Sequence, residues 1–456
     1  MFGRGDANQQ NSTTVKGLSW VSILRLGLVQ ASLGAIVVLT NSTLNRVMIV
    51  ELALAAVIPG LLVGLHYGVQ ISRPLWGHRS DIGNSRTQWI LGGLALLAVS
   101  GTAAAATTFL FEINFAAGLA AAVLAYALIG VGIGASGTSL LTLIATKTAP
   151  ERRASAATIT WMLMIAGIVV TSIVTGINLE PYSHLRLVTV TALTGVVVLV
   201  LSAIAVAGIE RKPTMVGETG REKPRSFRES VREVWSDPEA RLLTVFIFLS
   251  MLAYSTQDLI LEPFAGMLFG MSPGETTKLS GTQHGGIFAG MALVGIAGWL
   301  FSKRKPGLMK MFIVTGCVGS GVALACLAVS ASFAPAWPLE ANIFVLGFMN
   351  GAFAVAAIGT MMILAGAGKK ANEGMRMGVW GAAQAISFGL GGLAGTIALT
   401  LGRWATAQDS TAFAIVFSME AVLFLMSAAI ALRIGGGQVA KPRLPVHREP
   451  SAVPAE

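Results

Sequence analysis

Two acidic residues lie four positions apart in an otherwise apolar stretch, "STQDLILEPFAGMLFG" at residues 255–270. On a helix, Asp258 and Glu262 share one face, and Pro263 would loosen the helix directly after them. A charged side chain at the centre of a bilayer costs about 3 kcal/mol or more, so acids there usually pair with a cation or carry protons. The stretch therefore predicts a functional site inside a membrane segment.

An arginine at the end of an earlier apolar stretch, "LNRVMIVEL", is the candidate partner of these acids. We expect Arg46 to pair with Asp258, Glu262 or both, and so to close the periplasmic side between two halves of the protein. Losing one partner of a partly buried ion pair costs about 3–5 kcal/mol. The alternative is a hydrogen bond from a neighbouring hydroxyl to Asp258, with Glu262 facing water.

Six further polar side chains fall inside apolar stretches and are candidate binding residues. His66 and His284 are the two histidines at membrane depth, and a neutral imidazole is a common metal ligand. The alternative is a hydrogen bond to a neighbouring helix or, for His284, a place at the outer interface. The other four candidates are amides, and their alternative role is also interhelical hydrogen bonding, worth about 0.6 kcal/mol for each bond. They are Gln30, Asn41, Asn350 and Gln384.

The composition places these residues in a membrane. Apolar residues make up 54% of the chain and charged residues 12%, against about 25% charged residues in soluble domains. A spanning helix needs about 20 apolar residues, and the first apolar run has this length, so no cleavable signal peptide is expected. Runs of this kind predict twelve transmembrane helices, at 22–44, 52–72, 89–111, 115–145, 154–176, 186–208, 242–269, 282–301, 309–331, 340–364, 375–401 and 411–433.

The predicted helices form two halves of six, which resemble each other. "LNRVMIVEL" ends the first span and "TQDLILEPF" ends the seventh. Two similar halves around a site near the midplane are typical of transporters. The expected division is a disordered cytoplasmic N-terminus (1–17), a six-helix half (18–208), a cytoplasmic linker with an amphipathic helix (209–241), a second six-helix half (242–433) and a disordered cytoplasmic tail (434–456).

The net charge of +10 follows this topology. All but four of the 32 Lys and Arg residues lie in or near the termini and alternate loops; the others are Arg46, Arg186, Lys278 and Arg403. This distribution predicts that both termini are cytoplasmic. It accounts for the basic composition without a nucleic-acid partner.

The loop "RPLWGHRSDIGNSR" between the second and third predicted spans resembles the signature loop of the major facilitator superfamily. Gly77, Asp81, Gly83 and Arg86 match that signature, whereas two of its other positions do not. Glycines permit a tight turn, and a carboxylate can face the N-terminus of a neighbouring helix. The resemblance implies the major facilitator fold, with a role for this loop in conformational coupling rather than in substrate contact.

Three longer phrases, "TLNRVMIVEL", "LEPFAGMLFGMSPGETT" and "MRMGVWGAAQAISFGLGG", resemble the PucC/LhaA group of facilitator-fold proteins from purple phototrophic bacteria, often called the bacteriochlorophyll delivery family. The loop at 73–93 is closer to a branch labelled as a chain of bacteriochlorophyll synthase. The resemblance implies help in assembling light-harvesting complexes, in the inner (intracytoplasmic photosynthetic) membrane. Bacteriochlorophyll would be cargo rather than an intrinsic cofactor, with a histidine as axial ligand. Light-harvesting subunits or pigment-synthesis enzymes would be partners.

The sequence does not predict an enzyme or a metal site. It has no Walker loop, no HExxH motif, no nucleophile–base pair and no acid pair spaced for diphosphate–magnesium chemistry. Two other functions stay open beside pigment handling. One is proton-coupled transport of an unrelated small solute, which an intramembrane acid would suit. The other is a structural assembly role without a pigment site.

Overall fold

The structure, a computed structural model, describes residues 17–72, 85–149, 152–210, 232, 235–301, 307–367 and 373–434. In these ranges every regular element is a helix. Outside the described residues lie the loop residues Gly77, Asp81 and Gly83, most of the predicted linker, and nearly all of both predicted disordered ends.

The elements are α1 (Trp20–Val38), η1 (Leu39–Thr43), α2 (Leu44–Arg46), η2 (Val47–Glu51), α3 (Val57–Val69), η3 (Gln70–Ser72), α5 (Arg86–Ile113), α6 (Phe115–Lys147), α7 (Arg153–Asn178), α8 (His184–Val206), α10 (Pro238–Phe269), α11 (Pro273–Phe301), α12 (Leu308–Ser330), α13 (Leu339–Ala367), α14 (Glu373–Thr406) and α15 (Asp409–Arg433).

Ten helices of the described chain are long and apolar enough to cross a membrane. They are α1 with its continuation through η2, and α5, α6, α7, α8, α10, α12, α13, α14 and α15. Two other helices, α3 with 13 residues and α11 with 29, lie where the second and eighth spans were predicted. The protein is therefore an all-α, multi-pass membrane protein.

Several predicted spans have other ends in the structure, and the first and the eighth differ most. The first, predicted at 22–44, continues to Glu51 because the chain goes on through π-helical turns. The eighth, predicted at 282–301, begins at Pro273. Ser272 and Glu275 form a capping box there: the Glu275 N–H donates to Ser272 Oγ at 3.2 Å, and the Ser272 N–H donates to Glu275 Oε2 at 2.8 Å.

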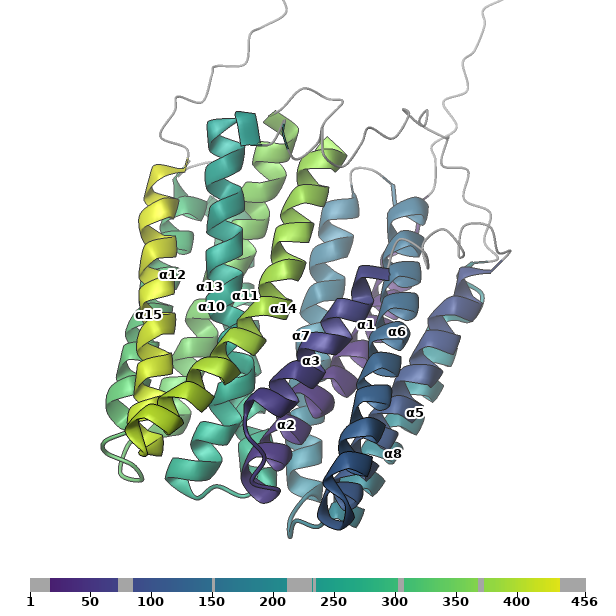
Figure 1. Ribbon diagram of the computed structural model, residues 1–456. Coiled ribbons are helices and arrows are strands. Elements are labelled where there is room, and N and C mark those ends of the chain that lie inside the picture. Colours follow the sequence, from purple (N-terminus) through teal and green to yellow (C-terminus); the bar gives the residue numbers. More distant parts are fainter. Residues whose placement is uncertain are drawn as a thin grey trace, which may run out of the picture.

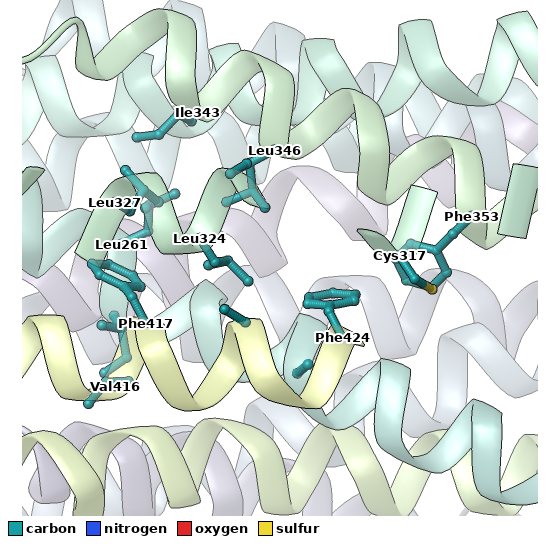
Figure 2. Close-up of a cluster of buried hydrophobic side chains, with 14 of the residues drawn as sticks. Leu261, Cys317, Leu324, Leu327, Ile343, Leu346, Phe353, Val416, Phe417 and Phe424 are labelled. Atoms are coloured by element: carbon teal, nitrogen blue, oxygen red, sulfur yellow. The ribbon is translucent and has the colours of Figure 1, made fainter. Parts of the chain in front are cut away.

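Two hydrophobic cores divide the described helices into an N-terminal bundle, α1 to α8, and a C-terminal bundle, α10 to α15 (Figure 1). Figure 2 shows part of the C-terminal core, where Phe417 of α15 packs near Leu324 of α12. Few described residues cross between the cores: Leu259 of α10 packs into the N-terminal core, whereas Ile49 of η2 and Ala56, just before α3, pack into the C-terminal core. Each bundle thus has a hydrophobic core of its own.

The bundles are joined near the end of the molecule opposite to the start of α1 and the end of α15, which we call the distal end (Figure 1). There the Thr43 and Thr277 hydroxyls lie 3.0 Å apart, and Asn45 Nδ2 donates to the Leu259 carbonyl oxygen at 2.8 Å. A third apolar cluster also joins the bundles; it consists of Val38, Leu39, Ile165, Ile168, Ile287 and Met291.

Candidate functional site between the bundles

A small pocket lies between the two bundles, with walls from η1, α3, α10 and α14. It has room for about one water molecule. Two of its polar atoms, Asn41 Oδ1 and Asp258 Oδ1, have no hydrogen-bond partner among the described residues. The lining residues are Asn41, Val63, Tyr67, Ser255, Asp258, Leu259, Phe388 and Gly392.

Aromatic rings line one side of this pocket. The Phe388 ring lies 6.2 Å from that of Tyr67 and 5.8 Å from that of Tyr254, between centroids. The His66 ring lies 4.1 Å from the Tyr67 ring. Binding sites for small organic molecules combine such apolar walls with a few polar anchors. A wider form of this pocket would therefore hold an apolar or flat group against the rings, with Asn41 and Asp258 as polar anchors.

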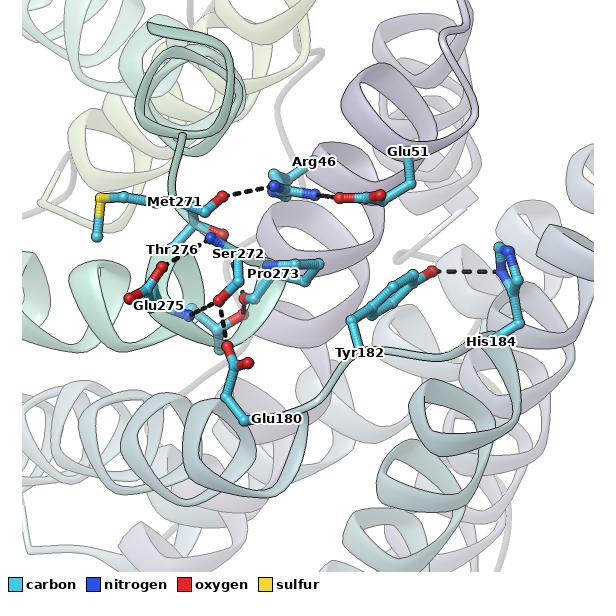
Figure 3. A network of polar contacts seen from close by, with 11 residues as sticks. Arg46, Glu51, Glu180, Tyr182, His184, Met271, Ser272, Pro273, Glu275 and Thr276 are labelled. Atoms are coloured by element: carbon cyan, nitrogen blue, oxygen red, sulfur yellow. Dashed lines mark hydrogen bonds and ion pairs between the residues drawn. The ribbon is translucent and has the colours of Figure 1, made fainter. Parts of the chain in front are cut away.

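Arg46 is at the centre of a polar network at the distal end (Figure 3). Its side chain is 2% exposed, Nη1 forms an ion pair with Glu51, and Nη2 donates to the Met271 carbonyl oxygen at 2.7 Å. The prediction that Arg46 pairs with Asp258 or Glu262 is thus wrong for this conformation. Arg46 still joins the two bundles, but it does so through a backbone carbonyl after α10.

Further contacts continue this network. Ser272 Oγ, on the C-terminal bundle, donates to the Glu180 carboxylate of the N-terminal bundle. The Tyr182 hydroxyl lies 3.2 Å from His184 Nδ1 (Figure 3). His184 Nε2 in turn lies 2.9 Å from Glu112 Oε1. Burial raises the pKa of the Tyr182 phenol, so the phenol keeps its proton. The distal end is thereby closed by polar contacts from both bundles.

Glu262 lies next to this network but has no bonded partner in it. Its side chain is 2% exposed, so it does not face water. Arg46, Thr276 and Ser280 surround its carboxyl group, yet neither oxygen has a partner of normal hydrogen-bond geometry among the described residues. Glu262 is therefore an unpaired acid within reach of the guanidinium.

Asp258 forms neither the predicted ion pair nor the alternative local bond. Ser255 Oγ donates to the Ser387 carbonyl oxygen, and Thr256 Oγ1 donates to that of Gly391, each at 3.0 Å. Both hydroxyls thus tie α10 to α14 instead of binding the carboxyl group. Asp258 lines the pocket, and its Oδ1 has no hydrogen-bond partner among the described residues.

The two candidate histidines lie in different parts of the molecule. His66 is 1% exposed in α3, with Nδ1 2.7 Å from the Val63 carbonyl oxygen. His284 is 7% exposed in α11, with Nδ1 2.8 Å from the Ser280 carbonyl oxygen. A carbonyl fixes one nitrogen of each ring, an arrangement that orients the other nitrogen.

The four candidate amides are not brought together. Asn41 alone lines the pocket. Gln30 Nε2 donates to Met164 Sδ at 3.3 Å, and its Oε1 has no described partner. Asn350 accepts from Ser320 Oγ at 2.8 Å inside the C-terminal core, and Gln384 Nε2 lies 4.0 Å from Met251 Sδ.

Arg86 is the described member of the signature loop, and it begins α5. Its backbone N–H donates to Glu210 Oε1 at 2.6 Å, and Thr87 donates to Oε2 through N–H and Oγ1 at 3.0 and 2.7 Å. Ser85 Oγ adds a fourth bond at 3.1 Å. Burial raises the pKa of Glu210, but the bonds from Thr87, Arg86 and Ser85 outweigh it, so the net pKa is lowered. The described end of the signature loop is thus attached to the chain segment that follows α8.

Sequence reasoning overlooked two buried polar residues. Gln257 is 0% exposed and Glu420 is 1% exposed, and neither side chain has a hydrogen-bond partner among the described residues. A signal existed for the second, since Glu420 is the one acid in the predicted span 411–433.

A larger hollow, of about 590 Å³, is an open groove on the outer face of α15. It contains no charged side chain and lies away from the polar pocket. Its lining residues are Thr411, Ala414, Ile415, Ser418, Met419, Val422 and Leu423.

The helix arrangement is that of membrane transporters with the major facilitator fold. A D-xylose–proton symporter superposes with a TM-score of 0.67 at 15% identity, covering 91% of this chain and 97% of that one. A bacterial homologue of the human drug peptide transporters PepT1 and PepT2 gives 0.66 at 15% identity, with 91% and 98% covered. These likenesses define the fold.

Within that fold class, the chain belongs to the PucC family, whose model, described as "PUCC protein", matches residues 43–439. The "Bacteriochlorophyll synthase 44.5 kDa chain" of Rhodobacter capsulatus is 52% identical, over 91% of this chain and 95% of that protein. "Protein PucC" of Rhodovulum sulfidophilum is 31% identical, over 81% of this chain and 83% of that protein. The resemblance seen in the sequence, including its branch, is confirmed.

Proposed function

We propose that this protein assists the assembly of light-harvesting complexes by handling bacteriochlorophyll in the membrane. The carrying observation is the pocket between the bundles, where Asn41 and Asp258 face aromatic rings, in a chain of the PucC family. The printed name of the relative with 52% identity ties that relative to bacteriochlorophyll. Light-harvesting subunits or pigment-synthesis enzymes are the proposed partners.

The proposed architecture is the full facilitator arrangement. α3 and α11 join the ten apolar helices to give twelve spans, in two halves of six. The distribution of Lys and Arg supports cytoplasmic termini, in an intracytoplasmic photosynthetic membrane. With this orientation the distal end is periplasmic, and Arg46 with its network is a periplasmic gate.

The pocket must widen to take a pigment. It has room for about one water molecule in this conformation, far less than a tetrapyrrole needs. We infer that pigment is admitted when the bundles move apart on the side away from the distal network, with His66 or His284 as the axial ligand. The signature loop, with Gly77, Asp81 and Gly83, would couple that movement to the start of α5.

Catalysis is not part of this proposal, although one relative carries a synthase name. Solved structures with this fold are transporters. The bonded carboxyl groups at the distal end hold backbone and hydroxyl groups, which suits a gate. The word "synthase" would then reflect the proteins with which the relative is associated, and not a reaction catalysed by this chain.

Two experiments test the proposal. Tagged protein purified in mild detergent from cells that make bacteriochlorophyll should retain pigment, and Asn41→Leu should retain less than the exposed control Glu340→Gln. Deletion of the gene should lower the amount of light-harvesting complex while pigment synthesis continues. If pigment synthesis stops at esterification and the purified protein performs that step, the proposal is wrong.

Proton-coupled transport of an unrelated small solute is the second candidate. The observation that favours it is Asp258, an acid with an unpaired oxygen at a pocket between two bundles. Liposomes with an imposed proton gradient would separate the two functions. Accumulation of a water-soluble solute that Asp258→Asn abolishes would favour transport.

A further inference from the structure

Glu420 occupies the buried face of α15, halfway along the helix. Its side chain is 1% exposed, and neither carboxyl oxygen has a hydrogen-bond partner among the described residues. Phe417 and Phe424, on the same face, are fully buried in the C-terminal core (Figure 2). The carboxyl group thus lies in the C-terminal core without a described hydrogen-bond partner.

The facing helix, α10, presents an unpaired amide to the same region. Gln257 is 0% exposed, and neither Oε1 nor Nε2 has a described partner. The Phe264 ring of α10 packs edge-on against the Phe417 ring of α15 at 4.9 Å between centroids. Gln257 lies seven residues before Phe264, and so on the same face of α10.

The direction of the helices brings the amide and the carboxyl group to facing surfaces. α14 runs parallel to α10, because Trp380 bonds to Thr244 and Gly391 bonds to Thr256. α15 follows α14 after a short turn and therefore runs antiparallel to α10. We measure along the helix axes from the Phe264–Phe417 pair toward the start of α10, at 1.5 Å per residue. Gln257 then lies about 10 Å away on α10, and Glu420 lies about 5 Å away on α15.

The charged groups that could act on Glu420 are few. Asp258, which follows Gln257 in the chain, interacts electrostatically with Glu420. On α12, Gly321 lies against Ala421, so Lys310 is about 16 Å away along that helix. On α14, Arg403 is paired with Asp409 at 2.7 Å. Asp409 begins α15 and lies about 16 Å along that helix from Glu420. Among the described side chains of α10, α12, α14 and α15, no cation is nearer.

We propose that Glu420 binds a proton in this conformation and forms, with Gln257 and Asp258, a protonation site that no known role of the chain accounts for. A carboxylate buried without a donor or a cation costs far more than a neutral carboxyl group, so such groups take up a proton. Asp258 follows Gln257 in the chain and borders the pocket, so we expect the charge at the pocket to influence the proton on Glu420. The site does not depend on what the pocket carries.

Infrared spectroscopy of the full-length protein in lipid at pH 7 tests this without any pigment. The absorption band of protonated carboxyl groups, identified by its shift in heavy water, should lose the equivalent of one group per protein in Glu420→Gln. The matched control Glu340→Gln, which removes an exposed carboxyl group of α13, should leave the band unchanged. An unchanged band in Glu420→Gln would overturn the proposal. Asp258→Asn should move the pH at which the Glu420 band is lost, and no movement would overturn the link.

A second variant covers the case in which Glu420→Gln does not fold. Glu420→Met keeps the volume and removes an unpaired polar group, a change that is neutral or stabilising when the group has no partner. The melting temperature should therefore stay equal or rise. A lowered melting temperature would mean that the carboxyl group has a stabilising partner, and the proposal would fail.

Discussion

Arg46 lies between two carboxyl groups. It is paired with Glu51 on its own side of the molecule, while the unpaired Glu262 of α10 lies within electrostatic range. Because the guanidinium can reach either acid, loss of one leaves the other as a replacement. The two acids should therefore be coupled energetically.

A double-mutant cycle tests this coupling. Glu51→Ala and Glu262→Gln should each lower the free energy of unfolding only modestly, because Arg46 keeps one carboxyl partner. The double variant should lose at least about 1 kcal/mol more than the sum of the two, since it leaves a buried charge unpaired. The measurement is denaturant unfolding in detergent, with Glu340→Gln as control. Effects that add within about 0.5 kcal/mol would contradict the coupling.

The matching places of Arg46 and Asp258 in the two halves predicted that Arg46 would pair with Asp258, Glu262 or both. It could not predict the pair with Glu51. In a regular α-helix, residues five apart point about 140° away from each other, at 3.6 residues per turn. The π-helical turn over Val47–Glu51 brings residues five apart into register, and no residue type in this stretch signals such a turn.

At the scale of elements, α10 and α14 approach so closely that only glycine fits at one position. A Cβ added to Gly391 would lie 1.9 Å from Ser255 Oγ and 2.6 Å from the Leu252 carbonyl oxygen. Two residues earlier on the same helix, a Cβ on Gly389 would meet its nearest atom at 3.6 Å, in ordinary contact. The two glycines provide a matched pair.

We expect Gly391→Ala to lower the free energy of unfolding by about 1–3 kcal/mol, the usual cost of overpacking, and Gly389→Ala to change it far less. The close approach involves a backbone oxygen, which cannot move aside as a side chain can. Thermal unfolding of the two variants side by side is the measurement. Equal melting temperatures would show that α14 can shift without cost.

The carboxylate of Glu210 holds the start of α5 through four hydrogen bonds. Its pKa is lowered in the folded protein, so its contribution to stability is present above the unfolded pKa of about 4.3. That contribution is lost as the pH falls through the lower folded pKa. Glu210→Gln keeps an acceptor but removes the charge near a helix N-terminus, at a cost of about 1 kcal/mol.

The melting temperature of Glu210→Gln should accordingly be below that of the unchanged protein at pH 7, and the difference should shrink as the pH is lowered below about 4. Glu239→Gln, in the first turn of α10, is the control for a general loss of charge. A difference that stays constant over this range would contradict the assigned role of Glu210.

The sequence predicted the existence and order of the helices better than their ends. Apolar runs mark where a chain lies in lipid, whereas α11 begins at Pro273, well before its apolar run. The capping box of Ser272 and Glu275 was readable in the sequence, as Ser-x-x-Glu after a glycine turn. Hydrophobicity alone does not reveal this helix start, because the first turns of α11 are polar.

At the scale of the whole molecule, the similarity between the stretches around Arg46 and Asp258 predicted two similar halves. The pocket could not be predicted in the same way, because Asn41, Tyr67 and Phe388 meet only after distant helices pack. Glu420 shows the same limit: burial without a partner is a property of the packed C-terminal core.

The separate cores of the two bundles bear on how the chain is made. The N-terminal bundle contains nearly all the described residues of its own core, and among the described residues of the C-terminal bundle Leu259 alone enters it. Nearly all residues of this core have therefore been synthesised once translation reaches Glu210, before α10 is made. The first bundle can pack in the membrane while the second is still being translated, and then serve as the surface on which α10 settles.

On this view the peptide connection between the bundles matters less than their distal contacts. Two fragments, 1–222 and 223–456, made together in one cell should insert, associate and copurify, held by Arg46, Asn45 and Ser272. A break between Ala253 and Tyr254, inside α10, should prevent association because it divides a helix that belongs to the second core. A tagged first fragment that purifies alone would show that the bundles depend on continuous synthesis after all.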